Sequence, residues 1–241
     1  MKVYIFYTDS HKILLDDFFL PSIKDEYNAE LDITKFAQKC PSGKLNDDGW
    51  IETMYFKVDT ILKGINENIN KQNNIFIHSD IDIQFFGDFI KDCKNIFSQS
   101  NCDILFQKGG RSICMGFFIC KANTKTKQFF TDIKSKMKTN GKNDEYNAKE
   151  LLNIPHNLSK KDLRKSIKRN GFDNPYSITW NYLPSNKYIN GTHVGLISFE
   201  NNAFKTPPKT TIMHHATCIR GVERKIKQLE YVRDYFNKSI I

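Results

Sequence analysis

Two carboxylates stand two residues apart directly after a short apolar run. The run is Ile75-Phe76-Ile77, and His78-Ser79-Asp80-Ile81-Asp82 follows it. The apolar run is typical of a buried strand, and open α/β sheets bind ligands at the carboxyl ends of their strands. Residues i and i+2 of an extended segment point the same way, so Asp80 and Asp82 can face one divalent cation. Carboxylate oxygens suit Mg²⁺ or Mn²⁺. A lone D-x-D is common by chance, and its place after a strand is what favours a metal site.

A second group of candidate residues lies near the end of the chain. His214 and His215 close the strand candidate Thr211–His215, and Gly221 and Lys225 follow. A histidine at a strand end could supply a nitrogen ligand, and imidazole in an oxygen-rich site favours Mn²⁺ over Mg²⁺. A lysine at the start of a helix could meet a phosphate. The other interpretation is that one histidine is a hydrogen-bonded core residue and Lys225 a surface charge.

Strand and helix patterns alternate in the first half of the chain, and these elements must position both groups. Strands are expected at Lys2–Tyr7, Glu30–Phe36, Ile75–Ile77, Asp103–Gln107, Met115–Cys120, Tyr176–Tyr182, Val194–Phe199 and Thr211–His215. Helices are expected at His11–Phe19, Trp50–Ile69, Phe89–Phe97, Phe129–Met137, Glu145–Leu152, Lys160–Ile167 and Gly221–Phe236. This order predicts an α/β fold with a mainly parallel sheet flanked by helices. A length of 241 residues fits one domain, 1–241.

Taken in this order, the motifs resemble those of GT-A nucleotide-diphospho-sugar transferases, close to the small glycosyltransferases encoded by large DNA viruses. The matching pieces are Val3–Tyr7 with Thr8-Asp9, the helix containing Lys57, His78–Phe86 with its D-x-D, Asp103–Gln107, Met115–Ile119, Asp144–Asn147, and His215-Ala216 with Gly221 and Lys225. The resemblance implies a GT-A fold in which 1–120 binds nucleotide and metal, and 121–241 forms the acceptor side and a closing helix. It also implies an enzyme that moves a hexose or pentose from a nucleotide sugar, favouring UDP, to a glycan or glycoprotein acceptor.

The resemblance also implies roles for individual residues. Asp80 contacts the ribose or the metal, Asp82 binds Mn²⁺ or Mg²⁺, and His215 completes the metal site. The residues expected to bind the nucleotide sugar are Tyr7, Thr8, Asp9, Lys57, Ser79, Asp80, Gly221 and Lys225. The family often has Asp-Gln where this chain has Asp144-Glu145, so either carboxylate could be the catalytic one. Their alternative role is to cap the following helix and to supply acids to its first turn.

Two other classes of function remain open from the residues alone. A phosphatase of the haloacid dehalogenase type also has D-x-D after a strand, but usually after the first one, whereas a strand and a helix precede Asp80 here. A non-catalytic basic module would bind nucleic acid or an anionic membrane, but it leaves Asp80, Asp82 and His215 unexplained.

The net charge of +9 is local. Residues 121–170 contain 14 basic and 5 acidic side chains, which is the whole excess. Most of these bases are Lys, whereas Arg is the usual reader of base edges, so we expect no nucleic-acid partner. A solvated surface is the plain interpretation of 121–170, and a peripheral membrane contact is the alternative.

Composition argues against several further classes of protein. A hydrophobic content of 39% argues against a disordered chain, and no apolar run is long enough to span a bilayer. The apolar stretch at the N-terminus is too short for a signal peptide, so a cytoplasmic protein is expected, virus-encoded and acting in a host cell if the resemblance holds. The six cysteines include no C-x-x-C pair, which predicts free thiols.

Overall fold

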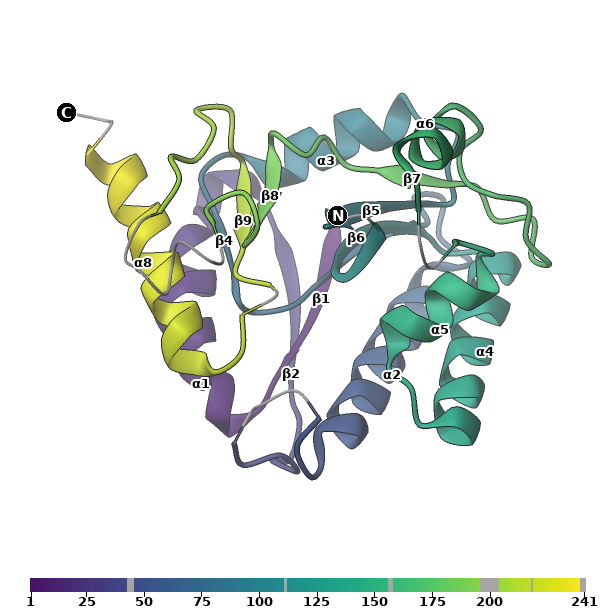
Figure 1. Cartoon of the computed structure of the whole chain (residues 1–241), viewed down its shortest axis with the longest axis horizontal. Helices are drawn as coiled ribbons and strands as arrows, with labels where there is room; N and C mark the ends of the chain where they lie inside the picture. The colour runs from purple at the N-terminus through teal and green to yellow at the C-terminus, as the bar shows by residue number, and fades with distance from the viewer. Residues whose placement is uncertain (43–45, 111, 156–157, 196–203, 218, 239–241) are drawn as a thin grey trace.

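A computed structural model describes residues 1–42, 46–110, 112–155, 158–195, 204–217 and 219–238. A twisted sheet runs through the middle of the molecule, and helices pack on both of its faces (Figure 1). This arrangement confirms the α/β fold with a mainly parallel, helix-flanked sheet that the sequence predicts.

The larger sheet orders its strands β2-β1-β3-β6-β5-β7 among the described residues. Their bounds are β1 Lys2–Tyr7, β2 Glu30–Lys35, β3 Ile75–Ser79, β5 Ile104–Gly109, β6 Ser112–Lys121 and β7 Trp180–Tyr182. The pairs β1/β2, β1/β3 and β5/β7 are parallel, and β6 runs antiparallel to both of its neighbours. The reversal of β6 follows from its hairpin with β5, in which Gly110 adopts a φ of +54°.

A smaller sheet brings together segments that are far apart in the sequence. It consists of β4 Ile83–Phe85, β8 Tyr188–Asn190 and β9 Met213–His215, in the order β4-β9-β8. β9 pairs antiparallel with β4 and parallel with β8. The sheet therefore holds the end of the chain against the segment that follows Asp82.

Helices cover the two faces of the larger sheet as two separate groups (Figure 1). The α-helices are α1 Lys12–Leu14, α2 Trp50–Asn68, α3 Phe89–Ser98, α4 Thr124–Asn140, α5 Asp144–Leu151, α6 Lys160–Lys168 and α8 Val222–Lys238. One core contains Val3 and Ile5 with residues of α1, α3 and α8, and the other contains Tyr4 with residues of α2, α4 and α5. The alternation of side chains along β1 thus supplies both cores, as expected for a strand buried on both faces.

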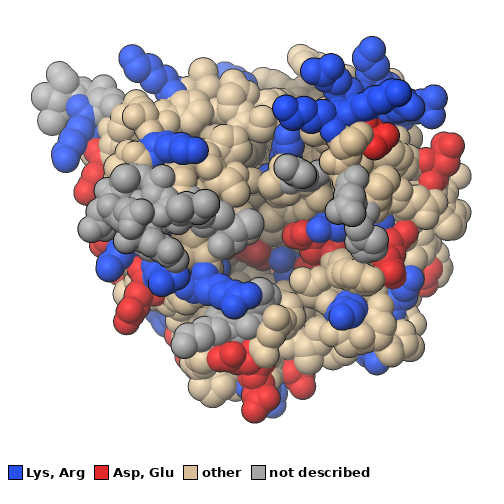
Figure 2. Space-filling view, in the orientation of Figure 1, with Lys and Arg blue, Asp and Glu red and all other residues tan. Residues whose placement is uncertain are grey.

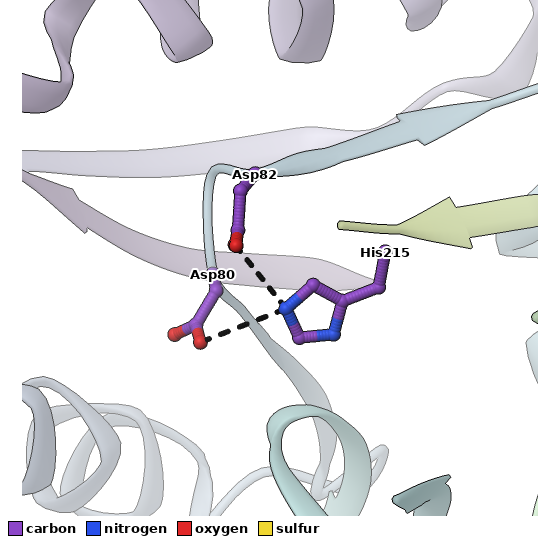
Figure 3. A group of neighbouring side chains, drawn as sticks. All are labelled: Asp80, Asp82 and His215. Atoms are coloured by element: carbon purple, nitrogen blue, oxygen red, sulfur yellow. Dashed lines mark ion pairs between the residues drawn. The ribbon is translucent and has the colours of Figure 1, made fainter. Parts of the chain in front are cut away.

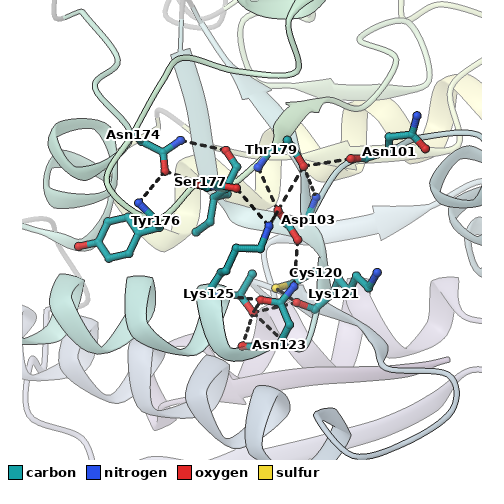
Figure 4. A network of polar contacts seen from close by, with 12 residues as sticks. Asn101, Asp103, Cys120, Lys121, Asn123, Lys125, Asn174, Tyr176, Ser177 and Thr179 are labelled. Carbon is teal, nitrogen blue, oxygen red and sulfur yellow. Dashed lines mark hydrogen bonds and ion pairs between the residues drawn. The ribbon is translucent and has the colours of Figure 1, made fainter.

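A buried carboxylate joins three elements at one end of the sheet (Figure 4). Asp103 accepts hydrogen bonds from the amide of Asn123, from the Lys125 ammonium and from the backbone N–H of Thr179, at 2.9, 3.1 and 3.0 Å. Asn123 also caps α4 by accepting a hydrogen bond from the backbone N–H of Thr126. Burial would raise the pKa of Asp103, but these donors outweigh it and lower the pKa. The carboxylate therefore ties the start of β5 to α4 and to the segment before β7.

Two expectations differ from the structure. His11–Phe19 was expected to be one regular helix, but it forms the end of a 3-10 turn, η1 Asp9–His11, then α1, then a π-turn, η2 Leu15–Phe19. The 3-10 turns η3 Leu20–Ser22, with Pro21 in its first turn, and η4 Asp25–Tyr27 follow before β2. The strands β4 and β8 were not expected, because runs of three residues carry no usable periodicity. The expected strand Val194–Phe199 lies largely outside the described residues.

Two further expectations concern the chain as a whole. No helix in the part of the chain that the structure describes is long and apolar enough to cross a membrane. The cysteines at 93, 102, 114 and 120 are free thiols, as predicted, and Cys218 lies outside the described residues.

Candidate functional site

The backbone on either side of the D-x-D is tied to two other segments. The backbone N–H of Asp80 donates to the carbonyl of Gly116 on β6 at 2.6 Å. The carbonyl of Asp82 accepts a hydrogen bond from the backbone N–H of Ala216 at 2.9 Å. Both carboxylates therefore leave a segment that is held from two sides, at the carboxyl end of β3.

His215 reaches the carboxylates because of the register between β4 and β9. Ile83 pairs directly with His215 in this register, which puts the imidazole beside Asp82. Its Nε2 lies 3.2 Å from Oδ1 of Asp82 and 4.0 Å from Oδ2 of Asp80. One potential ligand atom from each of the three residues lies within 4.8 Å of the others. Figure 3 shows the three side chains pointing toward one another.

The neighbouring His214 points away from this cluster. Successive residues of a strand face opposite sides, and His214 is buried between Gln84 and Gln228, at 3.3 Å from each. Burial lowers the pKa of His214 to about 3, so its imidazole is neutral. His214 is therefore the hydrogen-bonded core histidine, and His215 the one that faces the carboxylates.

Gln107 determines which nitrogen of His215 faces the carboxylates. Its Nε2 donates to the carbonyl of Ile189 at 2.9 Å, so its Oε1 must be the atom 2.7 Å from Nδ1 of His215. That oxygen can only accept, so Nδ1 carries a proton and Nε2 is the nitrogen presented to Asp80 and Asp82. A metal-ligating histidine usually has its other nitrogen held in this way.

Because Gly116 has no side chain, it leaves space for the side chains of Asp80 and His215. A Cβ built at Gly116 would lie 2.3 Å from Cε1 of His215 and 2.6 Å from Oδ2 of Asp80. No larger side chain fits between β6 and the cluster without displacing one of these two side chains.

Two lysines neutralise the carboxylates from opposite sides. Lys225, on the first turn of α8, forms an ion pair with Asp82. Lys57, buried on α2, lies 3.1 Å from Oδ1 of Asp80 and 3.5 Å from Oδ2 of Asp144. Burial would lower the pKa of Lys57, but the two carboxylates outweigh it and raise the pKa. Each of these carboxylates therefore lies beside a positive charge.

The same contacts shift the pKa values of the cluster. Burial would raise the pKa of Asp82, but Lys225 and His215 outweigh it and hold that pKa well below its usual range. Burial would lower the pKa of His215, but Asp82 outweighs it and raises the pKa to about 10. In the absence of a metal, His215 therefore balances Asp82 as a cation.

A cavity of about 510 Å³ opens beside the cluster. Its lining includes eight of the residues expected from the sequence: Tyr7, Thr8, Lys57, Asp80, Asp82, Glu145, Gly221 and Lys225. Tyr7 is the last residue of β1 and Thr8 follows it, and Gly221, with a φ of +88°, precedes α8. The ends of β1 and β3 and the starts of α2, α5 and α8 thus surround one space.

Four expected residues lie outside the lining of this cavity. Asp9 has an exposed side chain and pairs with Lys35 at 2.7 Å. Ser79 is buried, and its hydroxyl donates to the carbonyl of Asp80 at 2.8 Å. His215 contacts Asp82, and Asp82 rather than His215 lines the cavity. Asp144 is buried against Lys57.

Asn143, rather than Asp144 or Glu145, caps α5, because its side chain accepts a hydrogen bond from the backbone N–H of Tyr146. Asp144 and Glu145 are the acids of the first turn, and they point to different places. Asp144 faces Lys57, whereas Glu145 lines the cavity and pairs with Lys149 at 2.9 Å.

Sequence reasoning missed several residues that touch the site. Gln107 lies in an expected strand without any motif to mark it, and His11 and Trp50 line the cavity. His78 precedes the D-x-D and has its Nε2 3.8 Å from Oδ1 of Asp80. Its burial lowers its pKa, which leaves it neutral. Of these residues, only His78 could have been suspected from the sequence, because it lies two positions before Asp80.

The family model for nucleotide-diphospho-sugar transferases matches residues 44–229. The chain belongs to this family. It is a glycosyltransferase that depends on a nucleotide sugar, and the haloacid dehalogenase alternative is therefore wrong. The matched range contains the D-x-D, His215 and Lys225.

Solved structures of glycosyltransferases share the fold. One is a glycosyltransferase involved in the glycosylation of the major capsid of PBCV-1, with a TM-score of 0.52 and 10% identity over 96% of this chain and 98% of that one. Another is GlyE of Streptococcus pneumoniae TIGR4, with a TM-score of 0.50 and 11% identity over 99% of this chain and 64% of that one. The bifunctional glycosyltransferase WbbM has a TM-score of 0.51 and 8% identity over 98% of this chain and 51% of that one. This chain thus spans about two thirds of GlyE and half of WbbM. A comparison with curated proteins finds no matching sequence.

The residues present fit a divalent cation. Two carboxylates and one imidazole converge, the imidazole is held in one orientation by Gln107, and only a glycine at 116 leaves the space. Mixed oxygen and nitrogen donors are compatible with Mn²⁺ or Mg²⁺.

Proposed function

We propose that this glycosyltransferase is metal-dependent, uses a UDP-linked sugar, and holds Mn²⁺ between Asp80, Asp82 and His215. The convergence of these three side chains at the edge of the cavity carries the proposal. When bound there, a divalent cation would neutralise negative charge on the departing nucleoside diphosphate. The choice of uracil, and of Mn²⁺ over Mg²⁺, follows from the resemblance and from the imidazole donor.

Residues of the chain itself would bind and orient the donor. Lys225 and the backbone at the start of α8 would meet the diphosphate, because a helix N-terminus and a lysine both favour an anion. Tyr7 and Thr8 would contact the base and ribose. Asp9 and Ser79 were expected to take part, and their positions outside the lining leave them with at most an indirect role in this proposal.

Lys57 and the acids of α5 would act on the sugar side of the cavity. Lys57 would contact the donor from the wall opposite Lys225 and would be held in place by Asp80 and Asp144. Glu145 is our candidate for the carboxylate that stabilises positive charge at the sugar carbon or takes the proton of the acceptor hydroxyl. Glu145 lines the cavity, whereas Asp144 is buried away from it, and this difference supports the choice of Glu145.

The acceptor that we propose is a glycan or a glycoprotein. The similar enzyme that is involved in glycosylation of the major capsid of PBCV-1 supports this acceptor class by analogy. That the enzyme is virus-encoded and acts in a host cytoplasm is part of the same proposal and follows from the resemblance of the motifs. In this proposal residues 1–120 bind the donor together with His215 and α8, and the rest of 121–241 contributes the acceptor side of a single domain.

Thermal unfolding with UDP, GDP and dTDP, each with MnCl₂, MgCl₂ or EDTA, tests the proposal. A ligand at a hundred times its Kd adds about 2.7 kcal/mol of stability, which for this chain length corresponds to a rise in Tm of about 5–10 °C. We expect that rise with UDP and Mn²⁺ together, and little from either alone. A folded protein that responds to no nucleotide and metal pair would contradict the proposal. A screen of donor hydrolysis across UDP-sugars then identifies the sugar.

A further inference from the structure

The structure divides the basic segment 121–170 into two parts. Four lysines of α4 and α5 form ion pairs with acids: Lys125 with Asp103, Lys134 with Asp59, Lys136 with Glu150, and Lys149 with Glu145. The six cations at and beside α6 form no ion pair with any described residue, and they are Lys160, Lys161, Arg164, Lys165, Lys168 and Arg169. Lys121, Lys127, Lys138 and Lys142 also lack an ion pair with any described residue, but they are spread over 121–142, whereas six such cations lie close together at α6.

Four of these six cations lie on one face of the helix. Lys161, Arg164, Lys165 and Lys168 occupy positions i, i+3, i+4 and i+7, so they form a single exposed stripe. We call these four residues the α6 stripe. The opposite face is anchored by Leu163 and Ser166, the second of which is 1% exposed.

Acidic neighbours contribute little to this surface. Asp162 is the one acid in α6, and its carboxylate accepts a hydrogen bond from the hydroxyl of Ser159. Figure 2 shows the Lys and Arg side chains gathered over α6 at the upper right of the view, with little acidic surface between them.

This arrangement disfavours the helix by itself. Like charges three and four residues apart repel, by a few tenths of a kcal/mol for each pair in an isolated helix. An anionic partner would attract these cations and offset the repulsion between them. We propose that the α6 stripe docks the enzyme on a membrane surface of anionic phospholipid.

Three features favour a membrane over nucleic acid. Three of the four stripe residues are Lys, whose compact ammonium suits a diffuse layer of phosphate charge, whereas bidentate contacts to bases use Arg. Residues 160–169 contain no aromatic side chain that could stack on a base. Ile167 is 43% exposed beside Arg164, where an apolar side chain can enter the headgroup region.

The proposal is independent of the donor site. The diphosphate would be met by Lys225 and the metal, and no α6 residue lines the cavity. Docking would instead hold the enzyme near acceptors at an anionic surface.

The test compares two variants that each lose four positive charges from the same segment. The stripe variant combines Lys161→Gln, Arg164→Gln, Lys165→Gln and Lys168→Gln. The control variant combines Lys121→Gln, Lys127→Gln, Lys138→Gln and Lys142→Gln, all at exposed positions outside α6. Circular dichroism and the thermal shift with UDP and Mn²⁺ check that both remain folded and bind donor equally.

Vesicle co-sedimentation at low salt measures docking. Each Lys or Arg near an anionic surface contributes about fivefold in affinity, so with vesicles that are about one third phosphatidylserine the stripe variant should bind at least about a hundredfold more weakly than the unmodified protein. The control variant should lose much less, vesicles of phosphatidylcholine alone should bind poorly, and added salt should release the protein. Equal losses in the two variants, equal binding to neutral vesicles, or binding to a double-stranded DNA oligonucleotide without binding to anionic vesicles would each overturn the proposal.

Discussion

Oε1 of Gln107 lies 2.7 Å from Nδ1 of His215, and this buried hydrogen bond sets the orientation of the imidazole beside the two aspartates. The same glutamine donates to the carbonyl of Ile189, so one side chain links β5, β8 and β9. The nitrogen donor of the site is thereby oriented before any cation arrives, and this follows from the packing of three strands.

Replacing Gln107 should weaken metal binding by more than any loss of folding stability can explain. Gln107→Met keeps the length of the side chain but removes the acceptor for Nδ1, so we expect the affinity for Mn²⁺ to fall by about 10–100-fold. Gln84→Met is the matched control, because Gln84 is also buried and contacts His214 instead. Calorimetric titration of Mn²⁺ in the presence of UDP measures both. Equal loss of affinity in the two variants would show that Gln107 acts only through stability.

Gly116→Ala should damage the metal site with little effect on the sheet. The new methyl group would lie 2.3 Å from Cε1 of His215, so the imidazole must move away from the carboxylates. We expect Mn²⁺ affinity to fall at least about tenfold, as is typical when a ligand loses its orientation. At Gly87 the nearest neighbour of an added Cβ is Ile212 at 3.6 Å, so Gly87→Ala should bind Mn²⁺ normally. Normal binding by Gly116→Ala would mean that His215 does not need its present position.

Asp82→Asn should abolish the part of the thermal shift that requires metal. The variant loses a carboxylate ligand and leaves Lys225 without its partner, while His215 loses the charge that keeps its pKa high, so the variant should also unfold more readily without ligand, by about 3 kcal/mol. Asp59→Asn, which removes an exposed partner of Lys134, is the control. A full Mn²⁺-dependent shift in Asp82→Asn would exclude Asp82 as a ligand.

The two acids of α5 should have separable roles. Glu145→Gln should lower kcat by at least about 100-fold with the KM for donor nearly unchanged, because a general acid or base contributes about that factor. Asp144→Asn removes a partner of Lys57, so its main effect should be a higher KM for donor. Glu150→Gln, on the same helix, should keep normal kinetics. A normal kcat in Glu145→Gln would assign catalysis elsewhere.

Asp103 should make stability depend on pH in the acid range. Its pKa is lower in the folded chain than in the unfolded one, so its contribution is present above the unfolded pKa and is lost as pH falls through the folded pKa. At neutral pH, Asp103→Asn should cost about 1–3 kcal/mol, since hydrogen bonds to a charged group are lost. The difference from the unmodified protein should shrink below about pH 4. Urea unfolding at several pH values measures it, and a difference that stays constant with pH would refute this role of the charge.

Much of the fold could be predicted because local patterns carry it. Lys2–Tyr7 matches β1, and the apolar spacing of Trp50–Ile69 matches α2 to within one residue. The segment His11–Phe19 could not be predicted in detail, because η2 has only 5 residues, and a single turn is too short for the apolar spacing to separate a π-helix from an α-helix. The three-residue strands β4 and β8 are too short to show periodicity, and they form through pairing with β9.

The sequence alone determined which residues could form the site. It placed two carboxylates after a buried strand, a histidine pair at the end of another, and a local excess of positive charge in 121–170, since all of these are properties of neighbours along the chain. Only the tertiary structure decided that His215 faces the carboxylates while His214 is buried elsewhere, that Gln107 and Gly116 shape the cluster, and that the cations of α6 stay without an ion pair to any described residue while four lysines of α4 and α5 are paired. These outcomes depend on the β4/β9 register and on contacts between residues about a hundred positions apart, and the spacing of residues along the chain does not encode such contacts.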